Sequence, residues 1–145
     1  MKNKKLKHNR SSVCNIHYHI IWSVKYRRKV LTRQVEIEIE IEIELKSICQ
    51  QVGKDNGFTV SQLEVGNKDH VHCFITITPN IQISTIVKML KGISARLLFQ
   101  RFPILRQKLY KHRLWNQSYY VETIGSISEN RIKKIYSEST KIKVR

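Results

Sequence analysis

The chain has 145 residues, 41% of them hydrophobic, and 27 Lys and Arg against 11 Asp and Glu give a formal net charge of +16. This length suits one domain with one modest core. No stretch approaches the roughly 18 uninterrupted apolar residues of a membrane span, and the first residues lack the apolar core of a signal peptide. A domain this basic is most simply a polyanion binder, with nucleic acid ahead of an anionic membrane surface; a ribosomal or merely lysine-rich protein is the plainer alternative.

Residues 1–12 are expected to be a basic disordered tail, and residues 13–145 a single domain. The three cysteines are Cys14, Cys49 and Cys73, which are odd in number and lack Cys-x-x-Cys spacing. This pattern indicates a reduced, cytoplasmic setting and argues against a zinc knuckle.

Residues 13–24 are predicted to form a first strand, because large apolar side chains alternate with others: Ile16, Tyr18, Ile20 and Trp22 against His17, His19 and Ile21. The His-x-His within this strand lacks a flanking Asp, so we treat it as a decoy, with His19 as a support for metal ligands elsewhere. The strand runs into Lys25, Tyr26, Arg27, Arg28 and Lys29. Cations around an aromatic ring suit phosphate contact and base stacking, but a solvated basic turn explains the composition equally well.

Residues 32–52 carry two conflicting patterns. From Val35 to Leu45, Glu alternates with Ile or Val, a period of two that is typical of a strand with a charged face. Ile41, Leu45, Ile48 and Val52 instead follow helical spacing, and Gly53 with Asn56-Gly57 supplies a stop. We predict a helix.

Residues 69–78 are predicted to form the strand that carries the chemistry, joined as a hairpin to a strand at 58–65 through Gly66-Asn67-Lys68. Because side chains alternate along a strand, His70 and His72 share one face while Val71 and Cys73 share the apolar one. Two imidazoles two residues apart can bind one divalent cation and leave positions open for a phosphate. A His-x-His alone fits two partly exposed strand histidines as well.

The remaining elements are a helix from Ile83 to about Phe102, a strand at 114–124, and a last helix opened by the capping box Ser126 to Glu129 and carrying Tyr136. The order strand, helix, strand, strand, helix, strand predicts an α+β, ferredoxin-like fold. Its antiparallel four-stranded sheet would have two helices on one face and leave the other face for the histidines and the last helix.

Several ordered motifs together resemble the single-tyrosine HUH transposases of the insertion-sequence 200/605 type: His19 with Trp22, Lys25-Tyr26-Arg27-Arg28, Asp69-His70-Val71-His72, Leu90-Lys91-Gly92 with Ser94 and Arg96, and Leu114-Trp115 with Tyr119, Val121 and Thr123-Ile124-Gly125. The resemblance implies that His70 and His72 bind Mg²⁺ or Mn²⁺, and that a tyrosine on the last helix, here Tyr136, attacks single-stranded DNA. It also implies a homodimer, hairpin-bearing DNA as the partner, and no nucleotide cofactor. Lys91 and Arg96 are expected to join the basic loop in binding DNA.

The carboxyl end departs from the family pattern. Members close with a run such as Ile-Lys-Lys-Tyr-Ile-x-Asn-Gln, whose Gln is a third metal ligand, whereas this chain has Ile-Lys-Lys-Ile-Tyr-Ser-Glu-Ser at 132–139. One extra adenine in the lysine codons would convert the first run into the second. We therefore expect a single-base insertion in the lysine codons, which puts everything after Lys134 out of frame. This would displace Tyr136, leave only Glu138 as a replacement ligand, and weaken or abolish cleavage while sparing DNA binding.

Two other functions remain open. One is a hairpin DNA- or RNA-binding protein on the same fold without catalysis. The other is a ribosome-associated RNA-binding protein, which leaves the histidine pair unexplained. Tyr119 and Tyr120 are rival nucleophiles, although their place in an aromatic strand favours packing.

Overall fold

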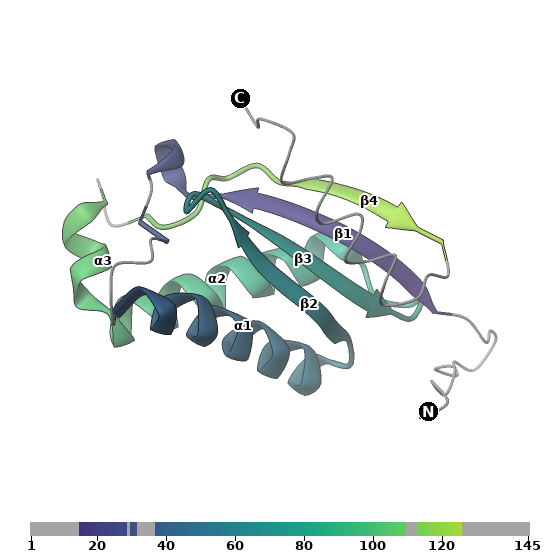
Figure 1. Ribbon diagram of the computed structural model, residues 1–145. Helices are drawn as coiled ribbons and strands as arrows, with labels where there is room; N and C mark the ends of the chain where they lie inside the picture. The colour runs from purple at the N-terminus through teal and green to yellow at the C-terminus, as the bar shows by residue number, and fades with distance from the viewer. Residues whose placement is uncertain (1–14, 29, 32–36, 110–112, 126–145) are drawn as a thin grey trace.

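The computed structural model describes residues 15–28, 30–31, 37–109 and 113–125 of the chain (Figure 1). Within them the elements are β1 (Ile16–Ser23), the short 3-10 helix η1 (Lys25–Arg27), α1 (Ile37–Asn56), β2 (Thr59–Gly66), β3 (His70–Ile77), α2 (Ile83–Arg101), α3 (Pro103–Lys108) and β4 (Tyr120–Ile124). The basic tail, the capping box and Tyr136 lie outside the described residues. In the part that is described, no helix has the length and apolarity needed to cross a bilayer.

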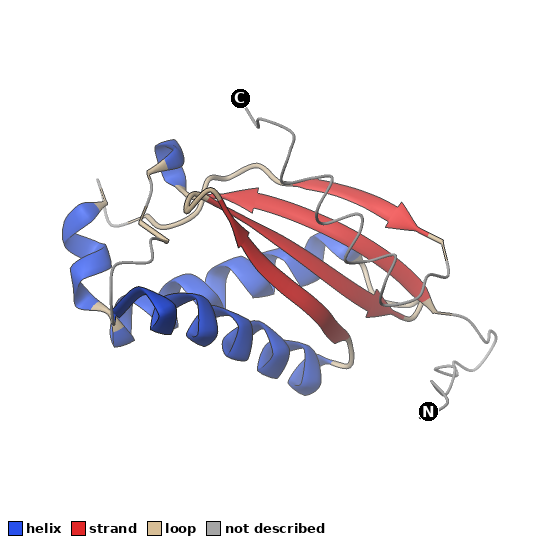
Figure 2. Cartoon of the chain, viewed as in Figure 1, coloured by secondary structure: helices blue, strands red, loops and turns tan. Residues whose placement is uncertain are grey.

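The four strands form one antiparallel sheet in the order β2-β3-β1-β4. Both long helices cover the same face of it, as Figure 2 shows with strands in red and helices in blue. This is the predicted ferredoxin-like arrangement, in which each βαβ crossover returns its helix to one side of the sheet.

The core lies between the sheet and these helices. The alternation in β1 and β3 places Ile20, Trp22, Val71 and Ile75 on the helix side, where each is 1% exposed or less. Cys49 and Cys73 are buried free thiols in this core. Burial raises the pKa of Cys49 to about 12 and that of Cys73 well above its usual range, so both are unreactive apolar fillers.

Helical spacing decides the structure of the Glu-Ile segment. Ile41, Leu45, Ile48 and Val52 are all buried against the core, whereas Ile43 is 58% exposed. A single apolar stripe with the 3.6-residue period is what α1 needs to pack on the sheet and α2. Glu42 and Glu44, on either side of Ile43, flank that stripe, and Glu44 pairs with Arg101 of α2.

The β2–β3 connection is a two-residue turn in which Asn67 and Lys68 have φ of 48° and 63°. Positive φ at both central positions is the geometry whose twist matches a hairpin. The turn closes through a hydrogen bond of 3.2 Å from the Asp69 amide to the Gly66 carbonyl. It places Asp69 and His70 at one end of the sheet.

The predicted strand at 114–124 is wrong in its first half, since β4 begins only at Tyr120. Trp115 makes an isolated bridge to Val24, and the carbonyls of Asn116 and Gln117 accept hydrogen bonds from the Lys91 ammonium at 2.6 Å and 3.0 Å. Carbonyls drawn toward α2 in this way do not continue a strand ladder. The helix α3 was not predicted; Pro103 lies at its start, where the missing amide donor costs nothing.

Candidate functional site

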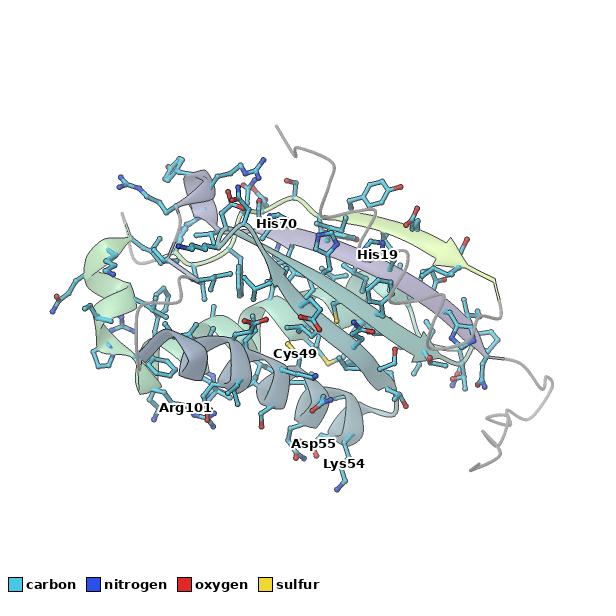
Figure 3. The ribbon with its side chains drawn as sticks, in the orientation of Figure 1. His19, Cys49, Lys54, Asp55, His70 and Arg101 are labelled. Atoms are coloured by element: carbon cyan, nitrogen blue, oxygen red, sulfur yellow. The ribbon has the colours of Figure 1, made fainter. Side chains whose placement is uncertain are left out.

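Three histidines and a glutamate gather on the face of the sheet opposite the helices. His70 and His72 come from β3, while cross-strand pairing sets His19 of β1 opposite both Phe74 of β3 and Glu122 of β4. Figure 3 shows His19 and His70 on the side away from α1. His19, His70 and His72 are 1%, 4% and 0% exposed. The predicted shared face for His70 and His72 is present, and their ring centroids are 5.0 Å apart.

His70 is anchored by its neighbour in sequence. Its Nδ1 lies 2.7 Å from Oδ1 of Asp69, whose side chain is only 5% exposed. Because a carboxylate can only accept, His70 must donate from Nδ1, which leaves the lone pair on Nε2. Arg27 lies 3.3 Å from Oδ2 of the same aspartate and connects the basic loop to this histidine.

His72 is anchored through a longer chain of hydrogen bonds. Glu122 Oε1 lies 2.9 Å from Nδ1 of His19, and Nε2 of His19 lies 2.9 Å from Nδ1 of His72. Since the carboxylate accepts from His19 Nδ1, neutral His19 can only accept at Nε2, and His72 must donate from Nδ1. The lone pair of His72 therefore also resides on Nε2.

The imidazoles of His19 and His72 are held in their neutral form. Burial lowers the pKa of His72 to about 3, with further lowering from His19 and His70. Burial also lowers the pKa of His19, and Glu122 opposes this only in part. Neutral imidazoles with the proton fixed on Nδ1 by a second group are the form in which histidine binds metals.

These residues fit a divalent cation. Nε2 of His70 is buried and has no hydrogen-bond partner among the described residues, as expected for an atom reserved for a ligand. Among the described residues, no three His, Cys, Asp or Glu side chains are placed to hold one ion together, so His70 and His72 would supply two positions and leave the others open. Gly66, paired with His70, makes room for the ring, because a Cβ there would lie 2.3 Å from Nε2.

The predicted DNA-binding residues divide into groups. Lys25, Tyr26, Arg27 and Arg28 follow β1 after Val24, and the Arg27 guanidinium contacts Asp69. Tyr26 and Arg27 have φ of 57° and 52°. Left-handed backbone at two non-glycine residues is strain that concentrates at functional sites. Tyr26 is 64% exposed, which suits a ring that stacks on a base.

Lys91 and Arg96 occupy opposite sides of α2. Lys91 lines a pocket together with Lys25, but its ammonium is engaged with the loop carbonyls described above, and burial lowers its pKa. Arg96 lines a hollow between α1 and α2, with Gln51 and Asp55, on the helix side of the sheet. The structure therefore places Lys91 near the basic loop and Arg96 apart from it.

The rival nucleophiles do not pack as expected. Tyr119 and Tyr120 are 39% and 55% exposed, so the predicted packing role is wrong. The Tyr120 hydroxyl donates to Oε2 of Glu122 at 3.1 Å, and this hydrogen bond raises its pKa. A raised pKa disfavours the phenolate that nucleophilic attack requires.

Sequence reasoning missed Glu122 and Gly66. Glu122 faces the opposite side from Val121 in a strand, which marks it as a residue on the polar face. Its pairing with His19 depends on the β1–β4 register, which spans about a hundred residues of chain. Nothing in the sequence indicates the close approach of His70 to Gly66.

Comparison with known proteins gives a consistent result. Residues 12–138 match the family described as "Transposase IS200 like". The chain is 40% identical over 134 residues to the ISDra2 transposase TnpA of Deinococcus radiodurans, covering 92% of this chain and 90% of that one. It is 30% identical over 122 residues to the transposase for insertion sequence element IS200 of Salmonella typhimurium, covering 84% of this chain and 74% of that one.

Solved structures agree in fold. A crystal structure of a Deinococcus radiodurans R1 protein assigned as a transposase has a TM-score of 0.70 and 37% identity, covering 93% of this chain and 98% of that one. A REP-associated tyrosine transposase bound to a REP hairpin has a TM-score of 0.57 and 16% identity, covering 93% of this chain and 73% of that one.

Proposed function

Because the chain belongs to the IS200-like transposase family, we propose that it cleaves and rejoins single-stranded DNA at hairpin-bearing transposon ends through a 5′-phosphotyrosine intermediate. The observation that carries this proposal is the hydrogen-bonding of the histidine pair. Two separate carboxylates, Asp69 and Glu122, fix the Nδ1 protons of His70 and His72 and leave both Nε2 lone pairs for one cation.

In cleavage, a tyrosine phenolate attacks the scissile phosphorus, the bond from phosphorus to the 3′ oxygen breaks, and that oxygen leaves as a 3′-hydroxyl after taking up a proton. Mg²⁺ or Mn²⁺ on His70 and His72 would polarise the phosphate and neutralise its developing charge. Rejoining reverses these steps from the phosphotyrosine, so no nucleotide cofactor is required. His19 and Asp69 hold the two ligand rings still throughout.

The basic loop supports the DNA-binding part of the proposal. Lys25 to Arg28 extend from the end of β1 where Ser23 pairs with His70, so cations and an exposed ring adjoin the candidate metal ligands. Phosphates bound there would bring the backbone of an unpaired strand toward the histidines.

Tyr136 is the nucleophile we propose, acting in a homodimer. The departures at 132–139 noted above favour a second candidate function for this copy, in which hairpin DNA is bound without efficient cleavage. The gene sequence tests the cause directly: the codons after Lys134 must regenerate a Tyr-x-x-x-Gln helix in another frame, or the insertion hypothesis is wrong.

The test is a labelled hairpin oligonucleotide incubated with the full chain and Mn²⁺. The transposase proposal expects a gel shift at low salt together with a covalent adduct that is lost in His72→Ala and in Tyr136→Phe but kept in Tyr119→Phe. A shift without an adduct favours the binding-only function. No shift at low salt contradicts both.

A further inference from the structure

A basic pocket lies on the helix side of the sheet, against α2. It has a volume of about 680 Å³ and lies between α2 and residues 113–119. We call it the α2 pocket. Its lining includes four cationic side chains, Lys25, Lys88, Lys91 and Arg113, and no Asp or Glu among the described residues.

The walls of the α2 pocket are fixed by hydrogen bonds before any ligand arrives. Lys91 joins α2 to the carbonyls of Asn116 and Gln117, and the Trp115 indole donates to the Ser94 hydroxyl at 2.9 Å. The amide of Lys25 donates to the Leu114 carbonyl at 2.8 Å. A preformed concave site of this volume is the kind that binds small ligands with little cost of ordering.

Two of the other cationic side chains in the lining, those of Lys88 and Arg113, are open to solvent. In the described part of the chain neither forms an ion pair with an acid. Tyr119, also in the lining, is 39% exposed, and the Lys91 ammonium lies 5.9 Å from its ring centroid. Cations around an accessible aromatic face match a phosphate joined to a flat base.

Lys25, just past the end of β1, belongs both to the basic loop and to the lining of the α2 pocket. Ser23 pairs with His70, the amide of Val24 donates to the Asp69 carbonyl, and Lys25 then lines the pocket. Two residues span no more than about 7 Å of chain. The entrance to the α2 pocket at Lys25 therefore lies at the same end of the sheet as the basic loop and the candidate metal ligands.

We propose that the α2 pocket binds one unpaired nucleotide of the single-stranded DNA next to the hairpin, with its base on Tyr119 and its phosphates near Lys25, Lys88 and Arg113. This assignment rests on the proposed function. It gives the protein a contact with the single-stranded flank that is separate from the hairpin.

The test compares a hairpin with and without a single-stranded flank, measured by fluorescence anisotropy at several salt concentrations. Lys88→Gln/Arg113→Gln is expected to reduce the salt slope for the flanked hairpin by about 1.4, since each single-strand phosphate contact contributes roughly 0.7, and to leave the bare hairpin unchanged. The matched control is Lys46→Gln/Lys54→Gln, which removes the same charge from exposed positions of α1. Figure 3 shows Lys54 pointing away from the sheet.

Base stacking is tested separately. Tyr119→Leu is expected to weaken binding of the flanked hairpin about 5- to 150-fold, and Tyr119→Phe to retain it. Abasic substitution at one flank position should weaken the wild type and have no effect in Tyr119→Leu.

The outcomes separate this proposal from the proposed function. Wild-type protein that binds neither hairpin at low salt overturns both. Wild type that binds both hairpins equally, or pocket variants that keep the benefit of the flank, overturns the pocket assignment alone. An equal reduction of the salt slope in Lys88→Gln/Arg113→Gln and in Lys46→Gln/Lys54→Gln also overturns the pocket assignment alone.

Discussion

Replacing Glu122 by Gln is expected to weaken Mn²⁺ binding at the histidine pair. The carboxylate accepts from His19, and this bond alone determines that His19 accepts from His72. A neutral amide can donate to His19 instead, which would reverse the chain of hydrogen bonds and place the His72 proton on Nε2, the atom needed by the metal.

The expected magnitude follows from exposure. Groups that orient metal-binding histidines are worth 10- to 100-fold in affinity. The Glu122 side chain is 42% exposed, and water therefore weakens its hydrogen bond to His19. We expect Glu122→Gln to lower the Mn²⁺ affinity about tenfold, or by about 1.4 kcal/mol. The Asp69 side chain is 5% exposed and its Oδ1 lies 2.7 Å from Nδ1 of His70. Asp69→Asn is therefore expected to lower the Mn²⁺ affinity by closer to 100-fold.

Isothermal titration with Mn²⁺ measures these affinities, and ¹⁵N NMR of the metal-free histidines reports which ring nitrogen carries the proton. Glu44→Gln is the matched control, because it removes the same charge from α1 on the other side of the sheet. Unchanged Mn²⁺ affinity in Glu122→Gln, or a His72 proton on Nε2 in the wild type, would refute the reasoning.

Three further outcomes are expected. Because the pKa of His72 is lowered to about 3, the unfolded chain binds more protons than the folded chain between pH about 3 and 6.5, and the free energy of unfolding decreases as the pH is lowered through that window. Urea unfolding in the presence of a chelator should show a decrease of about 2 kcal/mol between pH 7 and pH 5. Most of this decrease should be absent in His72→Gln. Gly66→Ala should displace the His70 ring and weaken Mn²⁺ binding while the far-UV circular dichroism stays unchanged; equal Mn²⁺ affinity would contradict the close contact. Tyr26→Gly should raise the free energy of unfolding by about 1 kcal/mol by relieving positive φ yet weaken hairpin binding, and a less stable variant would argue against strain in the loop.

Much of the fold could be predicted because local patterns coincide with it. The strand alternation around Ile20 and Val71, and the helical spacing of Leu45 and Ile48, each identify one buried face, and the two-residue turn at Asn67 needs only local backbone preference. The Glu-Ile repeat was ambiguous because a period of two and a period of 3.6 overlap there, and only burial against the sheet decides between them.

The candidate site was only partly predictable. His70 and His72 share a face by alternation alone, which any strand guarantees. The link from Glu122 to His72 through His19 requires the register of three strands, and the bonds of Lys91 to loop carbonyls require the tertiary approach of α2. Such contacts between distant segments leave no periodic signal in the sequence.

The most direct test of the central claim is pulsed EPR of Mn²⁺ bound to the protein with a single-stranded hairpin oligonucleotide. Couplings from two imidazole nitrogens at one Mn²⁺, reduced to one in His70→Asn and in His72→Asn, are the predicted result. A spectrum without imidazole coupling in the wild type would contradict the assignment of His70 and His72 as joint ligands.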